Sequence, residues 1–241
     1  MESRRATSSW STLRSSRPSE SSVTSTTNLY RPTGANELGL VYDGNMRGFP
    51  PRLPEQTIFY PVTNFPYAAT IAREWNTRGP AGIGYVTCFA VDTPYSSQFE
   101  RHVVGGREHE ELWIPADDLQ VFNDHIVGPI TVVAAFFAPD ATGSVPTDFG
   151  LRGRSASDQL VALDRLREDY PMDFHLEIAA NHRVVWLNYP LWALQRFATS
   201  VIDESRRAAC LDAVRAHWPP VRPSLPLLDQ AAPSADGRAK Q

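Results

Sequence analysis

The chain of 241 residues has little cysteine and no long hydrophobic run, and each absence excludes a class of protein. Cys88 and Cys210 lie far apart and form no CxxC pair, which excludes a disulfide framework and a cysteine-based zinc site. No run of 18 apolar residues occurs, so we expect no transmembrane helix. The polar residues 1–5 predict no classical signal peptide. These features predict a cytoplasmic protein without a membrane partner.

A basic charge pattern and the familiar catalytic motifs are also missing. The net charge is −4 and no basic stripe occurs, unlike the pattern of nucleic-acid binders. The glycines of residues 79–84 lack the spacing of a dinucleotide fingerprint, and there is no P-loop. The run starting at His109 resembles a zincin helix, but Trp113 stands where the second histidine is required. Ser155 lacks the second glycine of a nucleophile elbow. We therefore expect no metal site, Rossmann enzyme, P-loop NTPase or serine hydrolase.

Composition divides the chain into five segments. Residues 1–28 contain ten serines and five threonines, and we expect them to be disordered because they cannot bury enough apolar surface to offset the entropy of ordering. A globular part over 29–137 follows. Then come a linker rich in Pro, Gly and Asp over 138–157, a small accessory unit over 158–221 and a flexible tail over 222–241.

Hydrophobic periodicity predicts many short strands and few helices in the globular part. Strands are expected where β-branched and aromatic residues cluster or alternate, over 29–30, 57–62, 85–91, 102–104, 111–114 and 130–137. Helices are expected over 36–42, 66–77 and 116–123. This order favours an α+β fold over a regular βαβ alternation.

The accessory unit has a mixed pattern. Helices are expected over 159–168 and 203–217, where the pattern is helical and Pro219 follows closely. Alternating apolar residues over 173–178, followed by 183–188, predict a β-hairpin. The sequence therefore predicts a small C-terminal α/β unit.

The most informative stretch is the sequence ELWIP, which starts at Glu111. In a strand, Leu112 and Ile114 point to one face, while Glu111 and Trp113 point to the other. Glu110 would then lie opposite Glu111 and be solvated. A glutamate at the end of a strand is more often a solvated surface residue, so this pattern alone assigns no function.

This stretch resembles the third signature of the ADP-ribosyltransferase superfamily, a catalytic glutamate followed by apolar residues and often a proline. The first signature, a strand with an Arg or His that grips NAD, resembles Leu29-Tyr30-Arg31. The second, a central strand and its following helix, resembles residues 58–63 and the alanine-rich helix after them. The resemblance covers residues 29–137, which are also similar to uncharacterised bacterial proteins described as acting in ADP-ribosylation. It implies a split β-sheet core with flanking helices.

The resemblance implies NAD as the substrate, and it gives each signature a role. Glu111 would hydrogen-bond a ribose hydroxyl and stabilise the oxocarbenium-like transition state that forms as the bond to nicotinamide breaks. Arg31 would hold the diphosphate through its planar guanidinium. Tyr60 would stack on the nicotinamide ring and fix its orientation.

Three further residues follow from the same resemblance. Tyr30 and Thr63, in the first and second signatures, are candidate NAD contacts. His109 stands two residues before Glu111, where other branches carry a Glu or Gln that selects the acceptor, and it would act as a base near neutral pH. The chain also mixes branches, since members with Arg in the first signature usually carry a serine-rich second signature.

These features leave three functions open. The first is transfer of ADP-ribose to an unknown macromolecule, or hydrolysis of NAD. The alternative is a catalytically inactive fold that acts as a binding or interaction module, which the mixed signatures allow. A third is the same fold with another reaction, the removal of a phosphate from RNA ends. The net negative charge of the chain disfavours it, because such a substrate favours a basic cleft. For the same reason a protein acceptor is favoured over nucleic acid. The Ser/Thr-rich tail leaves open non-classical secretion as a toxin or effector.

Overall fold

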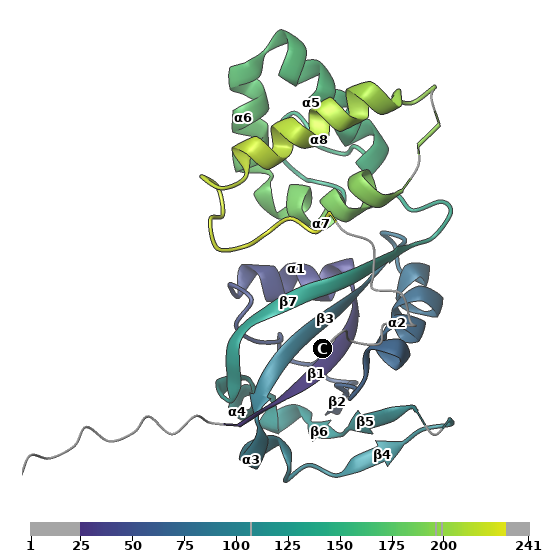
Figure 1. Cartoon of the computed structure of the whole chain (residues 1–241), viewed down its shortest axis with the longest axis vertical. Coiled ribbons are helices and arrows are strands. Elements are labelled where there is room, and N and C mark those ends of the chain that lie inside the picture. The colour runs from purple at the N-terminus through teal and green to yellow at the C-terminus, as the bar shows by residue number, and fades with distance from the viewer. Residues whose placement is uncertain (1–24, 107, 196, 199, 230–241) are drawn as a thin grey trace, which may run out of the picture.

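The computed structural model describes residues 25–106, 108–195, 197–198 and 200–229. It has a mixed α+β fold, in which an antiparallel three-stranded sheet with helices is followed by a C-terminal helical region (Figure 1). No helix among the described residues has the length and apolar character needed to span a membrane. The predicted disordered tail comprises residues 1–28, and residues 1–24 of it lie outside the described residues.

The strands, in chain order, are β1 (Thr26–Gly34), β2 (Ile58–Phe59), β3 (Ile83–Asp92), β4 (Arg101–Val103), β5 (Glu110–Leu112), β6 (Ile114–Pro115) and β7 (Ile126–Phe137). The helices are α1 (Ala35–Asp43), α2 (Phe65–Glu74), α3 (Thr93–Ser96), α4 (Leu119–Asp124), α5 (Ala156–Asp169), α6 (Pro171–Ala180), α7 (His182–Leu194) and α8 (Glu204–His217), with 3₁₀ turns at Asn76–Arg78 and Ala116–Asp118. This order confirms the predicted α+β class.

Strand β1 connects two groups of strands. On one side it pairs with β3 along its full length, and β3 pairs with β7. On the other side, Tyr30 exchanges backbone hydrogen bonds of 2.9 and 2.8 Å with Val62. Val62 in turn bridges Glu111, so the short strands β2, β4, β5 and β6 continue the structure from β1 (Figure 1). This junction brings residues from three distant segments together.

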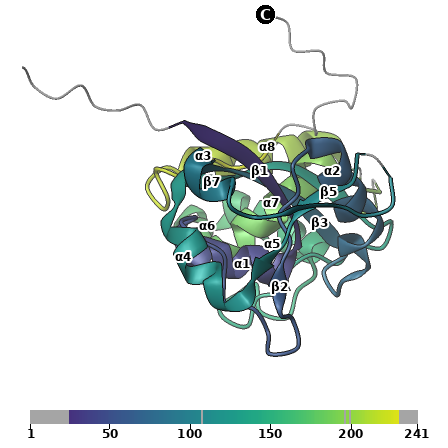
Figure 2. The ribbon, with the colours of Figure 1, turned by 90° about the horizontal axis from the view of Figure 1, so that it is seen from below.

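Helix α2 packs on the sheet through a face of alanines. These are Ala68, Ala69 and Ala72. The Asn64 side chain caps the helix by accepting the Tyr67 backbone N–H at 2.9 Å. Gly84 of β3 permits the close approach, because a Cβ there would lie 2.0 Å from the Ala72 carbonyl oxygen. Helices α1 and α2 lie on opposite faces of the sheet (Figure 2).

The described part of the C-terminal region contains helices α5 to α8 and no strand, so the predicted α/β unit is wrong. The two strands predicted over 173–178 and 183–188 belong to helices α6 and α7. In α6, Phe174 and Ile178 are buried one turn apart, whereas Leu176 between them is 58% exposed. The alternation of apolar residues therefore reflects a helical face and a single exposed leucine.

Helix α7 joins the C-terminal helices to the sheet by packing against α1 (Figure 1). The Tyr42 ring of α1 stacks on His182 at 5.6 Å between ring centroids and contacts Trp186 at 5.0 Å. Its hydroxyl lies 2.8 Å from Nδ1 of His182. The guanidinium of Arg222 lies 4.7 Å from the centroid of the same ring. The two regions therefore share a packed aromatic contact.

The predicted linker and the start of the predicted tail both make specific contacts. In the linker, the Ser144 backbone N–H donates to Oδ1 of the buried Asn188 at 2.7 Å. In the tail, the carbonyl of Pro226 accepts the Trp186 indole N–H at 3.0 Å. Residues 230–241 lie outside the described residues. Strand β1 likewise begins within the predicted N-terminal tail.

The contact between Tyr42 and His182 is expected to make stability fall in mildly acidic solution. Burial lowers the pKa of His182, Arg222 lowers it further, and Asp43 partly offsets both. The unfolded chain therefore binds more protons than the folded chain as the pH drops below about 6.5, so this contribution to the free energy of unfolding is present above that pH and lost below it.

Thermal unfolding at about pH 7.5 and about pH 5.5 tests this expectation. The midpoint should be lower at the acidic pH, and His182→Asn should show a smaller difference between the two conditions. An equal difference in the parent and the variant would contradict the role of His182.

Candidate functional site

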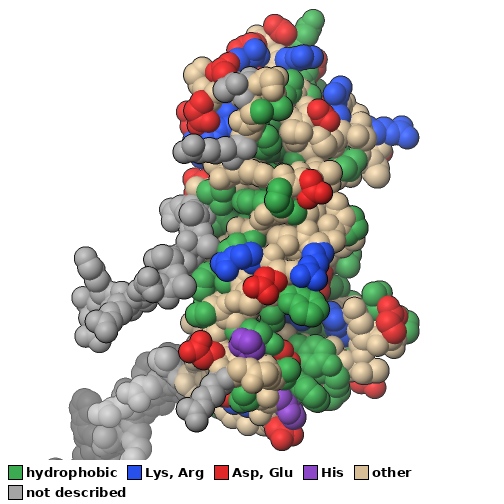
Figure 3. All heavy atoms as spheres, turned by 90° about the vertical axis from the view of Figure 1, so that its right-hand side faces the viewer, with side chains coloured by type: hydrophobic (Ala, Val, Ile, Leu, Met, Phe, Trp, Pro, Cys, Tyr) green, Lys and Arg blue, Asp and Glu red, His purple; other side chains and the backbone are tan. Residues whose placement is uncertain are grey.

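A pocket of about 310 Å³ opens where β1, β5 and α2 meet beside the end of β2. Its lining residues are Arg31, Pro32, Tyr60, Val62, Ile71, Asn76 and Glu111. Three of the six predicted site residues, Arg31, Tyr60 and Glu111, therefore come together. Basic, acidic, histidine and hydrophobic side chains are interspersed on the side of the molecule shown in Figure 3, and neither sign of charge dominates there.

Glu111 is held in place by two hydrogen-bond donors. As predicted, Leu112 and Ile114 are buried on one face of the strand, while Glu111 and Trp113 lie on the other. The Tyr67 hydroxyl donates to Oε1 of Glu111 at 2.7 Å, and the Trp113 indole N–H donates to Oε2 at 3.2 Å. Burial raises the pKa of Tyr67, and its bond to Glu111 raises it further, so this hydroxyl stays a donor at neutral pH.

Arg31 forms a two-point ion pair with Glu37 of α1. Its Nε and Nη2 donate to the two carboxylate oxygens, each at 3.0 Å, and Nη1 donates to the Tyr60 carbonyl at 3.2 Å. The guanidinium also lies 5.0 Å from the centroid of the Phe59 ring. Arg52 approaches the same carboxylate at 3.7 Å. Burial favours a raised pKa for Glu37, but the two guanidinium groups outweigh it and lower the pKa overall.

Two arginines therefore share one carboxylate, and of these three residues Arg31 lines the pocket. Their side chains are 12% and 9% exposed for Arg31 and Arg52, so water screens them little. Nε of Arg52 is buried and has no hydrogen-bond partner among the residues that the structure describes. The cluster of Arg31, Arg52 and Glu37 carries an excess positive charge that suits an anion.

Tyr60, a lining residue of the pocket, begins a row of aromatic rings that runs beside Glu111. The Tyr60 ring meets the Trp113 ring edge to face, at 5.8 Å between centroids and 86° between planes. His102 of β4 stacks on the other side of Trp113, at 4.0 Å. Trp113 is 40% exposed, so this row of rings borders solvent and could receive a flat ligand.

Tyr30 and Thr63 lie outside the pocket lining. Tyr30 points away from Arg31, to the face of β1 that packs against α2. Its ring instead meets Phe65 at 6.1 Å. The Thr63 backbone N–H donates to the Glu110 carbonyl at 3.1 Å, which joins its segment to β5. Both residues position the strands of the site.

His109 reaches the pocket only through a neighbour. Its imidazole stacks face to face on the Tyr67 ring, at 4.2 Å and 9° between planes. Its Nδ1 lies 3.2 Å from the Val104 carbonyl oxygen, within the turn that joins β4 to β5. Since Tyr67 bonds Glu111, the imidazole lies at the rim, one residue removed from the carboxylate.

The predicted site residues did not include three that contribute to the site. Trp113 shares the strand face of Glu111, and that alternation was the signal for its place. Tyr67 has no comparable signal, because its partner lies 44 positions further along the chain. Glu37 follows Arg31 by six positions, and they meet only because the chain turns from β1 into α1 at Gly34.

These groups together can perform three tasks. Glu111 can accept a hydroxyl hydrogen and stabilise a nearby positive charge. The arginine cluster can bind an anion, and the row of rings can hold a flat ring. Among the described residues, no cluster of three or more His, Cys, Asp or Glu side chains could hold a metal ion. No protein family, characterised protein or solved structure matches this chain. A function is therefore inferred from the geometry of the pocket.

Proposed function

We propose that this chain is an NAD-dependent ADP-ribosyltransferase with a split β-sheet core. It would cleave the bond between nicotinamide and ribose and pass ADP-ribose to a macromolecular acceptor or to water. The observation that carries the proposal is the meeting of Arg31, Tyr60 and Glu111, one residue from each of three separate signatures, in one pocket. The place of β1 between two groups of strands supports the split sheet.

Glu111 is the residue we propose to act on the ribose. Breaking the bond to nicotinamide builds positive charge on the ribose ring, and a fixed carboxylate stabilises that charge. Tyr67 and Trp113 are both neutral donors, so they orient the carboxylate without cancelling its charge. Each carboxylate oxygen retains a further site for accepting a ribose hydroxyl.

Arg31 and Tyr60 would hold the diphosphate and the nicotinamide of NAD. Arg31 and Arg52 carry two positive charges, and Glu37 compensates one of them. The remaining positive charge would attract the diphosphate. Tyr60, supported edge to face by Trp113, would stack on nicotinamide and fix the bond that breaks.

His109 is placed to serve the acceptor. It lies on the outer side of Tyr67, at the rim of the pocket, where a second substrate would approach. An imidazole can take a proton from an attacking group near neutral pH. The interspersed charges on the side of the molecule shown in Figure 3 favour a protein acceptor over a nucleic acid, which needs a basic surface.

One observation favours a catalytically inactive binding module instead. The bidentate ion pair with Glu37 occupies two nitrogens of Arg31, and the third bonds the Tyr60 carbonyl. In that reading the arginine has a structural role and the pocket binds a ligand without cleaving it.

The deciding experiment gives the purified chain NAD labelled in nicotinamide or, separately, in adenosine, with and without cell lysate. Free nicotinamide with adenosine label on a macromolecule would establish the transferase, and free ADP-ribose alone would establish NAD hydrolysis. A thermal shift with NAD but no nicotinamide release would favour the binding module. No release and no thermal shift would refute both.

Arg31→Lys is expected to raise the KM for NAD by about tenfold and to change kcat little, because a lysine cannot make parallel hydrogen bonds to Glu37 or to a diphosphate. Steady-state measurement of nicotinamide release separates the two constants. Arg152→Lys is the matched control, since Arg152 is exposed in the loop before α5. An unchanged KM in Arg31→Lys would argue against diphosphate binding at this residue.

Tyr67→Phe is expected to lower kcat by about tenfold with little change in KM, since a hydrogen bond to a charged group contributes about 1.5–3 kcal/mol. The variant keeps the ring that stacks on His109 and loses only the bond to Glu111. The same assay measures it. Tyr95→Phe, which also removes one hydroxyl, should retain the parent kcat; a normal kcat in Tyr67→Phe would show that Glu111 needs no such support.

A further inference from the structure

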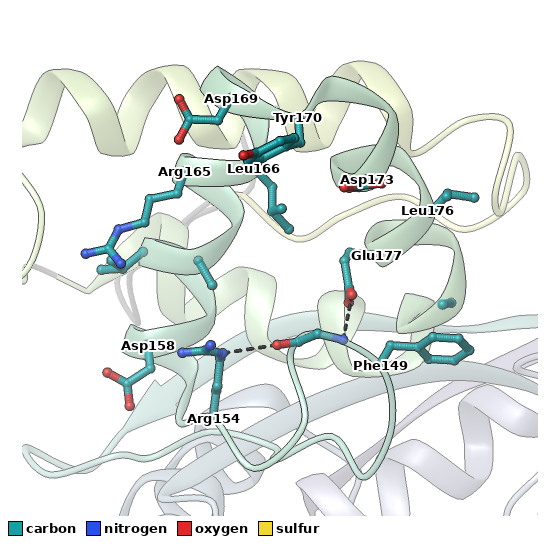
Figure 4. A pocket seen from close by; sticks show the side chains of 14 residues that line it. Phe149, Arg154, Asp158, Arg165, Leu166, Asp169, Tyr170, Asp173, Leu176 and Glu177 are labelled. Atoms are coloured by element: carbon teal, nitrogen blue, oxygen red, sulfur yellow. Dashed lines mark hydrogen bonds between the residues drawn. The ribbon is translucent and has the colours of Figure 1, made fainter.

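A larger pocket, of about 790 Å³, lies in the C-terminal region between α5, α6 and the loop that precedes α5 (Figure 4). None of its lining residues belongs to the pocket around Glu111. Its volume falls in the range of sites for drug-sized molecules. We propose that it binds an amphipathic organic cation, a protonated amine or guanidine joined to an aromatic or branched hydrocarbon.

Hydrogen bonds fix the shape of the pocket. The backbone N–H of Gly150 donates to Oε1 of Glu177 at 2.6 Å, and the Gly150 carbonyl accepts Nε of Arg154 at 3.1 Å (Figure 4). Oε2 of Glu177 accepts the Asn181 amide at 2.9 Å, which fixes this carboxylate from its other side. These bonds tie the loop to α6, so a ligand would enter a largely preformed site.

The loop also stores backbone strain at the pocket. Phe149 has φ of +58°, a left-handed conformation that a bulky side chain rarely adopts. Its ring is 67% exposed at one end of the pocket. The anchored Gly150 next to it maintains this conformation, which leaves an aromatic ring open to solvent beside a cavity.

The pocket has an apolar interior with further exposed apolar groups. Val161, Ala162 and Leu166 of α5 face it. At its other edges Tyr170 is 61% exposed and Leu176 is 58% exposed. Large apolar side chains gathered around a cavity are typical of a surface that a ligand covers. The hydrocarbon part of a ligand would rest here.

The charges at the pocket select a cation. Its lining contains four carboxylates, those of Asp158, Asp169, Asp173 and Glu177, against the guanidinium groups of Arg154 and Arg165. The Arg165 guanidinium points away from Tyr170 and Glu177 (Figure 4). Negative charge is therefore in excess.

Two of these carboxylates have no partner within the described part of the chain. Asp169 and Asp173 flank Tyr170 at the corner between α5 and α6, and neither makes an ion pair or side-chain hydrogen bond with another described residue. A cation over the Tyr170 ring would interact with its π face and lie near both carboxylates. An anionic ligand would meet repulsion there, and a neutral one would lose this attraction.

Three probes that share a phenyl ring on a four-carbon chain test the proposal with the full chain: phenylbutylamine, phenylbutanol and phenylbutyrate. Isothermal titration calorimetry should give the amine an affinity at least about tenfold higher than that of the alcohol, with the carboxylate weakest. Equal affinities for amine and alcohol in the parent protein would overturn the proposal.

Variants then locate the binding. The double variant D169N and D173N should lower the affinity for the amine to that for the alcohol. Its affinity for the alcohol should equal that of the parent. Tyr170→Leu should lower the affinity for the amine several-fold. The matched control is Glu55→Gln, an exposed carboxylate outside the pocket. All altered side chains are exposed, so thermal midpoints should stay near that of the parent. An amine preference that survives in the double variant would refute this site.

Discussion

Replacing Glu111 by glutamine is expected to lower the rate of nicotinamide release from NAD by about 10²- to 10³-fold, the size of losing one preorganised electrostatic stabiliser. The glutamine amide keeps the size of the side chain and one oxygen that Tyr67 or Trp113 can bond. It removes the negative charge that stabilises the oxocarbenium-like transition state. The effect should therefore fall on kcat, measured as initial rates with saturating NAD.

Glu110→Gln is the matched control on the adjacent position. The Glu110 side chain lies on the opposite face of β5 and pairs with Arg101 at 3.1 Å, where the Arg101 side chain is 54% exposed. An exposed pair of this kind contributes little to stability, so the variant should retain a rate within about twofold of the parent. Equal losses in both variants would indicate damage to the strand, and no loss in Glu111→Gln would refute the proposed catalytic role.

The local pattern around Glu111 was predictable because one side of its strand is buried. Leu112 and Ile114 are 1% and 0% exposed, and Glu111 and Trp113 share the other face. A period of two is a direct consequence of strand geometry, so the sequence alone contains it. The alanines of α2 were predictable for the same kind of reason, with a helical period.

Helices α6 and α7 could not be predicted in the same way, whereas α5 and α8 match the helices expected over 159–168 and 203–217. Phe174 and Ile178 are one helical turn apart, and the exposed Leu176 between them completes an alternation that also fits a strand. Helix α7 is buried on most sides, from Val185 to Trp192, so it has no polar face to reveal its period. Short apolar runs of this kind fit both structures until packing decides between them.

The partners of the site residues were not predictable, because they depend on long-range packing. The bond from Tyr67 to Glu111 forms only when α2 lies on the sheet beside β5. The ion pair between Arg31 and Glu37 forms only when the chain turns from β1 into α1. The sequence indicated which side chains could act, while the fold determines what holds them.

The buried side of α7 leads to the second large effect. Trp192→Ala is expected to lower the free energy of unfolding by about 3–5 kcal/mol, because it removes a large buried ring. Trp192 is 0% exposed, and its indole N–H donates to the Ala156 carbonyl at 2.7 Å. The variant also leaves that carbonyl without its partner.

This loss should affect the whole described fold rather than the C-terminal helices alone. The buried cluster that contains Trp192 runs without a break to β3 and α1, and the buried Tyr85 hydroxyl of β3 donates to the Leu187 carbonyl of α7 at 2.6 Å. Urea unfolding followed by circular dichroism should therefore show one transition, shifted to lower urea. Trp75→Ala, at a tryptophan that is 66% exposed, should shift it little. Two separate transitions in Trp192→Ala, with the sheet unaffected, would instead show that the C-terminal helices unfold as an independent unit.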